Sequence, residues 1–149
     1  MLQLNDTAPD INLYDETGAR FKLSDRRGQR LLLVFYPGDN TPVCTRQLCD
    51  YRDGIESFSD LGVEVVGVSP DDAESHLQFK KKFNLPFILL SDTDLTVAER
   101  YDCKGILGMK RGVFLIDGKG KLRYIHVEAV ALFRRRREEL LEVISTMDQ

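Results

Sequence analysis

The feature that most constrains the fold is a continuous apolar run, residues 31–36, that leads into a short proline-bounded segment containing a cysteine. Its length and its aromatic and β-branched residues predict a buried strand. After a loop, Thr41 can serve as the N-cap of a helix, because its hydroxyl can accept a hydrogen bond from a first-turn N–H group. Pro42 then takes the first helical position, where its missing N–H costs nothing. This arrangement places Cys44 in the first turn of a helix.

A cysteine in this position can be unusually reactive. The thiolate is the nucleophilic form, and a helix N-terminus or a nearby cation lowers the pKa of a thiol below about 8.5. Most free cysteines instead pack as small hydrophobic side chains, and a purely structural Cys44 would keep its usual thiol pKa. The strand, the cap, the proline and a second cysteine five residues on, Cys49, favour the reactive interpretation.

Hydrophobic patterning predicts an α/β fold. The expected strands cover residues 11–14, 20–23, 31–36, 63–69, 87–90, 112–116 and 122–127. The expected helices cover residues 42–61, 73–83, 95–101 and 129–147, and residues 105–108 are expected to form a loop. Helices between successive strands predict right-handed parallel units. Turns at 15–18 and 117–120 predict an N-terminal and a late hairpin, so a mixed central sheet flanked by helices is expected.

Length and charge limit the classes of function. A chain of 149 residues with a net charge of −3 is expected to form one domain, 1–149, with no affinity for nucleic acid or anionic membranes. No stretch resembles a signal peptide or a membrane span, so a cytoplasmic location is expected. The run Arg134–Arg137 is followed by Glu138 and Glu139. Ion pairs at i,i+4 make this a solvated helix rather than a nucleic-acid site.

Three cysteines do not indicate a disulfide framework. A zinc site built from Cys44, Cys49 and Cys103 with His76 or His126 is the main alternative. Structural zinc sites usually contain two pairs of closely spaced ligands, and this chain has one wider pair. A Cys-x-x-Cys motif for disulfide exchange is also absent. We therefore predict no metal and no other cofactor.

The pattern Pro37-x-x-x-Thr41-x-x-Cys44 resembles the active-site signature of the peroxiredoxins, thiol-dependent peroxidases with a thioredoxin-like fold. Cys49 resembles the resolving cysteine of the Q-type branch, also called the bacterioferritin comigratory protein group. The resemblance extends from residues 8–10 to residues 111–117, where Arg111 resembles the active-site arginine. Position 43 differs from the usual pattern of this branch, because the chain has valine where glycine is common.

The resemblance implies a mechanism. Cys44 would attack a hydroperoxide, with Thr41 contacting the peroxide, Pro37 shielding the sulfur and Arg111 supplying charge. Cys49 would then resolve the Cys44 sulfenic acid as an intramolecular disulfide. Thioredoxin or a similar dithiol protein would recycle it, without metal, haem or flavin. Q-type relatives imply a monomer or weak homodimer. The alternative function is a peroxide-sensing thiol switch or chaperone-like binding protein that uses the same cysteine pair.

Helix geometry restricts this disulfide. Five residues along a helix rise about 7.5 Å and turn the two side chains more than about 100° apart, whereas a disulfide needs Cα atoms within about 7 Å. Residues 42–50 are therefore predicted to unwind in each catalytic cycle. Cys103 is expected to be a half-buried free thiol, and a role as alternative resolving thiol is left open.

Overall fold

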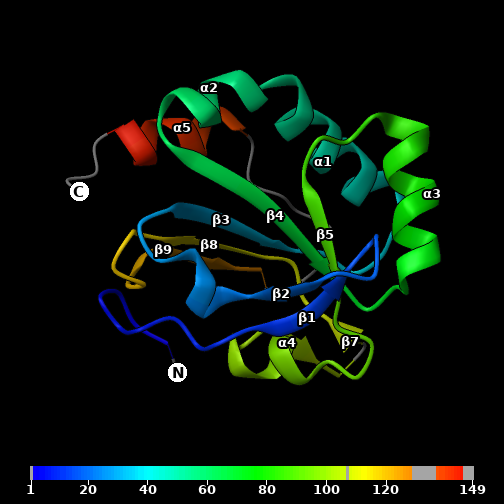
Figure 1. Cartoon of the computed structure of the whole chain (residues 1–149), viewed down its shortest axis with the longest axis horizontal. Helices are drawn as coiled ribbons and strands as arrows, with labels where there is room; N and C mark the ends of the chain where they lie inside the picture. Colours follow the sequence, from blue (N-terminus) through cyan, green and yellow to red (C-terminus); the bar gives the residue numbers. More distant parts are fainter. Residues whose placement is uncertain (1, 107, 129–136, 146–149) are drawn as a thin grey trace.

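A seven-stranded mixed sheet forms the centre of the computed structural model, which describes residues 2–106, 108–128 and 137–145 (Figure 1). The strands lie in the order β2-β1-β5-β4-β3-β8-β9. Their bounds are β1 Asn12–Asp15, β2 Arg20–Lys22, β3 Arg30–Phe35, β4 Val63–Ser69, β5 Ile88–Ser91, β8 Gly112–Ile116 and β9 Leu122–Val127. All seven predicted strands are present.

The pairing confirms the predicted α/β topology. Strand β3 pairs in parallel with β4, and β4 pairs in parallel with β5. Strands β8 and β9 form the predicted late hairpin, and β8 lies antiparallel beside β3. The N-terminal hairpin of β1 and β2 is present and lies at the other edge of the sheet.

Helices and irregular segments cover both faces of the sheet. The helices are α1 Pro42–Asp53, α2 Ile55–Asp60, α3 Ala73–Phe83, α4 Thr96–Arg100 and α5 Arg137–Ser145, and a 3₁₀ turn covers Leu23–Arg26. Figure 1 shows α1, α2 and α5 on one side of the sheet and α4 on the other. None of the helices within the described ranges is long and apolar enough to cross a lipid bilayer.

The core consists of two clusters, one on each face of the sheet, because side chains alternate along a strand. From β3, Leu31, Leu33 and Phe35 contribute to the cluster that contains the α4 side chains. The intervening Leu32 and Val34 contribute to the other cluster, which contains side chains of α1, α2, α3 and α5. We call these the α4 face and the α1 face.

The predicted helix over residues 42–61 is two helices. It is interrupted at Gly54, whose φ of −101° and ψ of 12° depart from helical values. The backbone N–H of Gly54 still bonds to the carbonyls of Asp50 and Tyr51. The predicted packing face is correct across this break, since Leu48, Tyr51 and Phe58 are all fully buried.

Two further predictions need correction or fall outside the described residues. The expected loop at 105–108 contains a small antiparallel ribbon, β6 Lys104–Gly105 with β7 Gly108–Met109. The final helix is described as α5, with Leu140 and Ile144 buried as predicted. Residues 129–136 and 146–149, and the side chains of 137–139, lie outside the described part, so the expected arginine–glutamate pairs are not tested.

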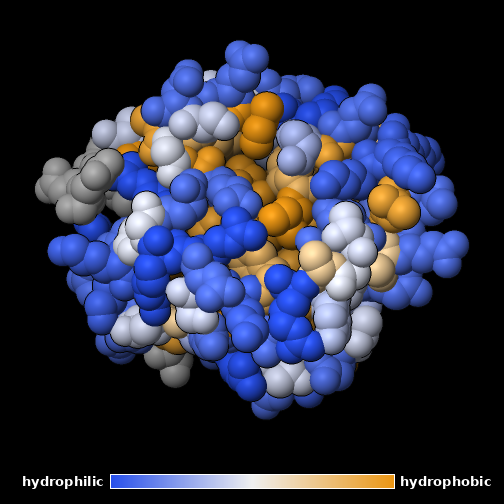
Figure 2. Space-filling view, in the orientation of Figure 1, coloured by the Kyte–Doolittle hydropathy of each residue, from blue (hydrophilic) through white to orange (hydrophobic). Residues whose placement is uncertain are grey.

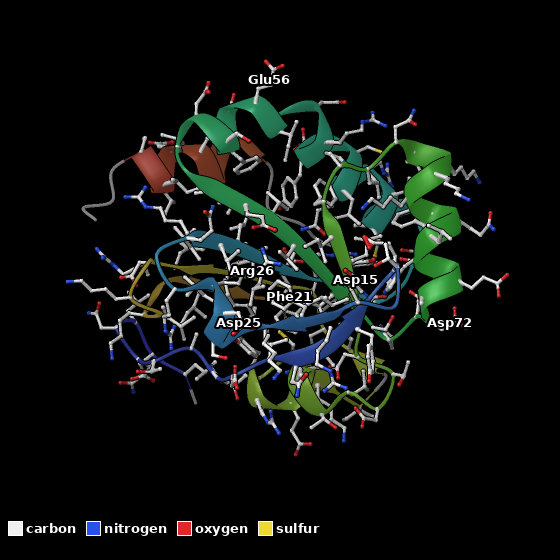
Figure 3. All side chains as sticks on the ribbon, viewed as in Figure 1. Asp15, Phe21, Asp25, Arg26, Glu56 and Asp72 are labelled. Carbon is white, nitrogen blue, oxygen red and sulfur yellow. The ribbon has the colours of Figure 1, made fainter. Side chains whose placement is uncertain are left out.

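Local polar contacts fix the N-terminal hairpin. The Asp15 carboxylate accepts hydrogen bonds from the backbone N–H of Thr17 at 2.8 Å and of Ala19 at 3.0 Å. Burial opposes the ionised form, but these bonds outweigh it and lower the pKa of Asp15. The Arg26 guanidinium lies 4.7 Å over the ring of Phe21, which joins the 3₁₀ turn to β2 (Figure 3).

Candidate active site

Cys44 and Arg111 come together at the carboxyl end of β3. The chain leaves β3, passes through the loop over residues 36–41 and enters α1, where Cys44 occupies the first turn. Arg111 directly precedes β8, and β8 pairs with β3 so that Gly112 lies opposite Phe35. This register brings the Arg111 side chain to the start of α1, and its Nη2 donates to the Cys44 sulfur at 3.1 Å.

Both groups are almost completely removed from solvent. Cys44 is 0% exposed and Arg111 is 1% exposed. A buried guanidinium requires partners for its charge and its N–H groups. The contact with Cys44 therefore places a permanent positive charge directly against the sulfur.

Gln47 links this arginine to the interior of α1. It lies one turn after Cys44, is fully buried and accepts a hydrogen bond from Arg111 Nη1. Its own Nε2 donates to the Tyr51 hydroxyl at 3.1 Å. Burial raises the pKa of Tyr51, so its phenol stays neutral. The sequence analysis did not identify Gln47, although a polar residue three positions after Cys44, on the face predicted to be buried, was a usable signal.

Glu128 lies on another side of the same guanidinium. Its Oε2 is 3.8 Å from Arg111 Nε, and its backbone N–H donates to the Arg111 carbonyl at 2.8 Å. Its Oε1 is 3.4 Å from Nε2 of His126. The sequence analysis also missed Glu128. The turn at 117–120 alone does not give this position, because the pairing shifts between Leu115 and Ile116, and only the shifted register that pairs Gly112 with Val127 places residue 128 opposite residue 111.

Thr41 occupies the predicted N-cap position but does not cap α1 with its side chain. The hydroxyl donates to the Gly38 carbonyl at 3.1 Å and makes no hydrogen bond to a first-turn amide. The predicted capping bond is therefore wrong. The hydroxyl bridges the loop instead, and the Thr41 carbonyl accepts from Thr45 N–H at 2.8 Å. Pro37 is half-buried in the same loop.

The three cysteines are free thiols in distinct surroundings. Cys49 is half-buried in the same helix as Cys44, and burial raises the pKa of its thiol. Cys103 is fully buried, not half-buried as expected, and burial raises the pKa of its thiol from 9.0 to about 12. Cys44 belongs to the α1 face and Cys103 to the α4 face. The sheet therefore separates the thiols that the zinc alternative would have to bring together.

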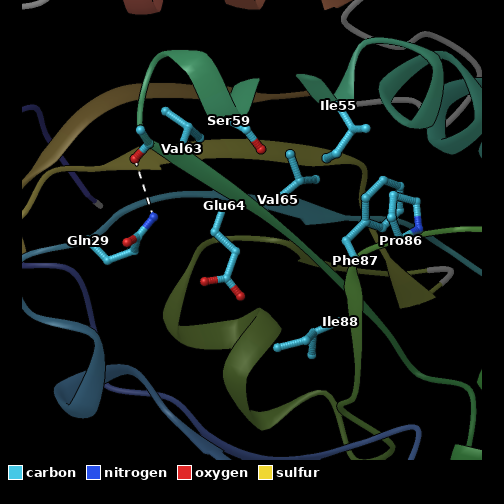
Figure 4. A pocket seen from close by; sticks show the side chains of 10 residues that line it. Gln29, Ile55, Ser59, Val63, Glu64, Val65, Pro86, Phe87 and Ile88 are labelled. Carbon is cyan, nitrogen blue, oxygen red and sulfur yellow. Dashed lines mark hydrogen bonds between the residues drawn. The ribbon is translucent and has the colours of Figure 1, made fainter. Parts of the chain in front are cut away.

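A separate hollow of about 430 Å³ lies at the opposite end of β4. The β4–β5 pairing begins at Val66 with Ile88, so the first residues of β4 precede the paired region. Hydrophobic side chains gather there in Figure 2, and Figure 4 shows the lining, where Gln29 Nε2 donates to the Gly62 carbonyl at 3.3 Å. Neither Cys44 nor Arg111 lines this hollow.

Comparison with known proteins agrees with the arrangement at Cys44. Residues 4–125 match the AhpC/TSA family. The chain belongs to this family. Peroxiredoxin Bcp of Bacillus subtilis (strain 168) is 43% identical over 129 residues, which cover 81% of this chain and 82% of that protein.

Solved structures also superpose closely on this chain. The crystal structure of peroxidoxin BcpB from Mycobacterium tuberculosis gives a TM-score of 0.88 at 28% identity and covers 100% of both chains. Bacterioferritin comigratory protein from Xanthomonas campestris, described by its alkyl peroxide reduction activity, gives 0.84 at 25% identity, covering 97% of this chain and 96% of that one. These findings confirm the predicted Q-type branch and thioredoxin-like fold. The chain is a thiol peroxidase that uses a peroxide substrate and a thiol reductant.

Proposed function

We propose that this chain reduces hydrogen peroxide and organic hydroperoxides with Cys44 as the nucleophile. The observation that carries the proposal is the Arg111 guanidinium against the buried sulfur, at 3.1 Å. A thiolate is the form that attacks a peroxide, and a fixed cation stabilises it relative to the neutral thiol. Arg111 is held in place by Gln47 and Glu128, so its charge does not need to reorganise during the reaction.

In the first step, the Cys44 sulfur forms a bond to one peroxide oxygen while the O–O bond breaks. The sulfur is oxidised to a sulfenic acid, and the departing oxygen leaves as hydroxide or alkoxide, which takes up a proton. The helix geometry gives the first-turn N–H groups of α1 no intrahelical acceptor. Since the Thr41 hydroxyl does not bond to them, these groups and Arg111 can donate to the departing oxygen. Thr41 would contact the peroxide, and Pro37 would exclude water from the sulfur.

In the second step, the Cys49 thiol attacks the sulfenic acid, which releases water and forms the Cys44–Cys49 disulfide. Both cysteines lie in the continuous helix α1, so the pair is too far apart to bond in this conformation. The N-terminal half of α1 must therefore unwind before the disulfide forms. A dithiol protein such as thioredoxin would then exchange with the disulfide and restore both thiols.

Peroxide turnover with a thioredoxin system tests the proposal. The wild-type protein should consume many equivalents of peroxide, Cys44→Ser should consume none, and mass spectrometry of the oxidised wild type should locate a Cys44–Cys49 bond. A single stoichiometric oxidation without turnover would favour the thiol-switch alternative. Full turnover by the Cys44→Ser variant would contradict the assignment of the nucleophile.

A further inference from the structure

A buried charged pair attaches the active-site loop to helix α3. Asp39 lies in the loop that precedes α1, and its side chain is 1% exposed. His76, on α3, is 0% exposed and holds its Nδ1 at 2.8 Å from Asp39 Oδ2. Its other ring nitrogen, Nε2, lies 3.0 Å from the carbonyl oxygen of Leu90 in β5. The pair therefore connects three elements that are distant in the sequence.

The surrounding hydrogen-bond donors and acceptors determine the charge of the His76 ring. A carbonyl only accepts, so His76 Nε2 must carry a hydrogen. The Asp39 carboxylate also accepts from the Tyr36 hydroxyl at 2.7 Å and from the Ser75 hydroxyl at 2.9 Å. Because several donors favour the ionised carboxylate, His76 Nδ1 donates too, and the ring is an imidazolium. Burial lowers the pKa of His76, but the hydrogen bond and charge of Asp39 outweigh it, and the net pKa is raised.

A second carboxylate holds the backbone of the same loop. The N–H of Asp39 donates to Asp71 Oδ2 at 2.7 Å, and the Ser69 hydroxyl donates to the same oxygen at 2.7 Å. The next residue, Asn40, has a left-handed φ of 63°, a conformation that asparagine tolerates and that turns the chain toward α1. The loop is thus fixed by side chain and backbone directly before the active-site helix.

These groups also resemble a metal site, because Asp39, Asp71 and His76 each place one ligand-type atom within 4.8 Å of the others. Their atoms are already used in hydrogen bonds inside the protein. A cation would have to displace the proton between His76 and Asp39 and compete with the hydroxyl and backbone donors. The geometry therefore favours an ion pair over a metal centre.

We propose that Asp39 and His76 are positioning residues that hold the upstream end of the unwinding segment in place, so that Cys44 leaves α1 while the loop carrying Pro37 stays fixed. This role rests on the proposed Cys44–Cys49 chemistry. Cys44 is five residues after Asp39, and five extended residues reach about 17 Å. That length of chain lets Cys44 move away from Arg111 while Asp39 stays in place. Removing one partner of a buried ion pair costs about 3–5 kcal/mol, so the pair resists separation while the first turns of α1 open.

The same pair gives the loop a dependence on pH. His76 faces Asp39 and Tyr36 from the loop side, Asp71 from the end of β4, and the neutral Leu90 carbonyl from β5. Since the folded-state pKa of His76 is raised, the imidazolium is fully present below its usual value of about 6.5. It is lost as the pH rises through the raised value. The loop is therefore held most firmly below about pH 6.5 and less firmly as the pH rises through the raised pKa of His76.

Asp39→Asn tests the role, because it removes the charge with almost no change in shape. Ser75→Ala is the matched control, since it removes one hydrogen bond to Asp39 but leaves the charged pair. Rapid quenching with a thiol-alkylating reagent and mass spectrometry would follow the peroxide step and the disulfide step separately. Asp39→Asn should slow the peroxide step at least tenfold without slowing disulfide formation. The control should stay within threefold on both steps, and an unchanged peroxide rate in Asp39→Asn would overturn the proposal.

A second measurement uses the wild-type protein and does not depend on any variant folding. Amide exchange should show loss of protection at residues 43–49 on oxidation, with the Asp39 amide still protected. Nitrogen NMR at a pH below about 6.5, the usual pKa of histidine, should show His76 as an imidazolium in both redox forms. A neutral His76, or loss of Asp39 protection while the Cys44–Cys49 disulfide forms, would overturn this inference alone. Absence of the disulfide would instead overturn the proposed function together with the role built on it.

Discussion

At the scale of single residues, Arg111 contacts three partners through three different nitrogens. Nη2 contacts the Cys44 sulfur and Nη1 contacts Gln47, while Nε lies 3.8 Å from the Glu128 carboxylate. Such an arrangement needs the planar, permanently charged fork of arginine. A lysine could place one charge near the sulfur, but it could not keep the contact with Gln47 at the same time.

Arg111→Lys is therefore expected to lower the second-order rate constant for peroxide reduction by about 10²–10³, the usual cost of removing one oxyanion-stabilising donor. Stopped-flow measurement of the peroxide reaction checks this. Arg123→Lys is the control, because it makes the same chemical change at the far end of the β8–β9 hairpin. Arg123 pairs there with Asp117 at 3.4 Å. Equal losses in the two variants would refute a specific role for Arg111.

For individual residues, the sequence predicted where a side chain lies along the chain better than it predicted which other side chains it contacts. The position of Cys44 in the first turn of a helix was predicted from local signals alone, since a strand, a proline and a helix start lie within a few positions of it. The predicted Thr41 cap is wrong because the side chain is turned toward the preceding loop, where the hydroxyl donates to the Gly38 carbonyl and accepts no bond from a first-turn amide. Gln47 and Glu128 needed knowledge of which polar side chains are buried, which depends on packing between distant elements.

At the scale of elements, α1 combines two opposing requirements. Its intact form holds Cys44 against Arg111, while the proposed Cys44–Cys49 disulfide would require its first turns to open. Its interruption at Gly54 separates α1 from α2, so opening of the N-terminal turns does not have to propagate into α2. Residues 42–61 were predicted to form one helix because the apolar spacing continues across Gly54, and spacing alone does not reveal a local change in backbone angles.

Substitutions that lower helix propensity in α1 should therefore speed disulfide formation, and substitutions that raise it should slow disulfide formation. Val43→Gly lowers helix propensity by about half a kcal/mol and should speed disulfide formation about twofold, whereas Thr45→Ala should slow it about threefold. Rapid-quench measurement of the disulfide after one equivalent of peroxide gives both rates. Ser57→Gly, at an exposed position in α2, is the matched control and should leave the rate of disulfide formation unchanged. A similar acceleration by Ser57→Gly would show that overall stability, not opening of α1, sets the rate.

At the scale of the whole molecule, the sheet separates two thiol environments. Cys44 packs on the α1 face and Cys103 on the α4 face. The sequence left Cys103 open as an alternative resolving thiol, because spacing along the chain does not say on which side of a sheet a residue lies. The positions of the three cysteines relative to the sheet favour Cys49, and not Cys103, as the resolving thiol.

Cys49→Ser should consequently stop at the sulfenic acid. Peptide mapping under non-reducing conditions should find no link between Cys44 and Cys103 after peroxide treatment, and turnover with thioredoxin should fall to the background rate. Cys103→Ser should keep wild-type turnover. Detection of a Cys44–Cys103 disulfide in the folded protein would contradict the separation of the two faces.

Burial of Cys103 also predicts a loss of stability at high pH. Because its pKa is raised from 9.0 to about 12, only the unfolded state loses this proton between those values. The free energy of unfolding then falls as the pH rises through that window, by up to about 1.4 kcal/mol per pH unit for this group. Urea unfolding at several pH values should show a shallower fall for Cys103→Ala. An identical slope would mean that the thiol ionises equally in both states.

The overall topology was predictable because each strand has a clear apolar pattern and each connection between parallel strands contains a helix. The meeting of residues 44 and 111 was suggested only by family resemblance. In the structure it depends on the register of β8 beside β3, with Gly112 opposite Phe35. Sequence patterning gives no such register for strands that are this far apart in the chain.

That register has a practical consequence. Since β8 runs away from Arg111 and alongside β3 in reverse, the turn over residues 117–120 lies beside the start of β3, at the far end of the sheet from Cys44. Lys119 is exposed at this turn. A sensor surface coupled through its amine would carry the protein with the active-site end of the sheet facing the solution, although the Cys44 sulfur itself is buried in this conformation.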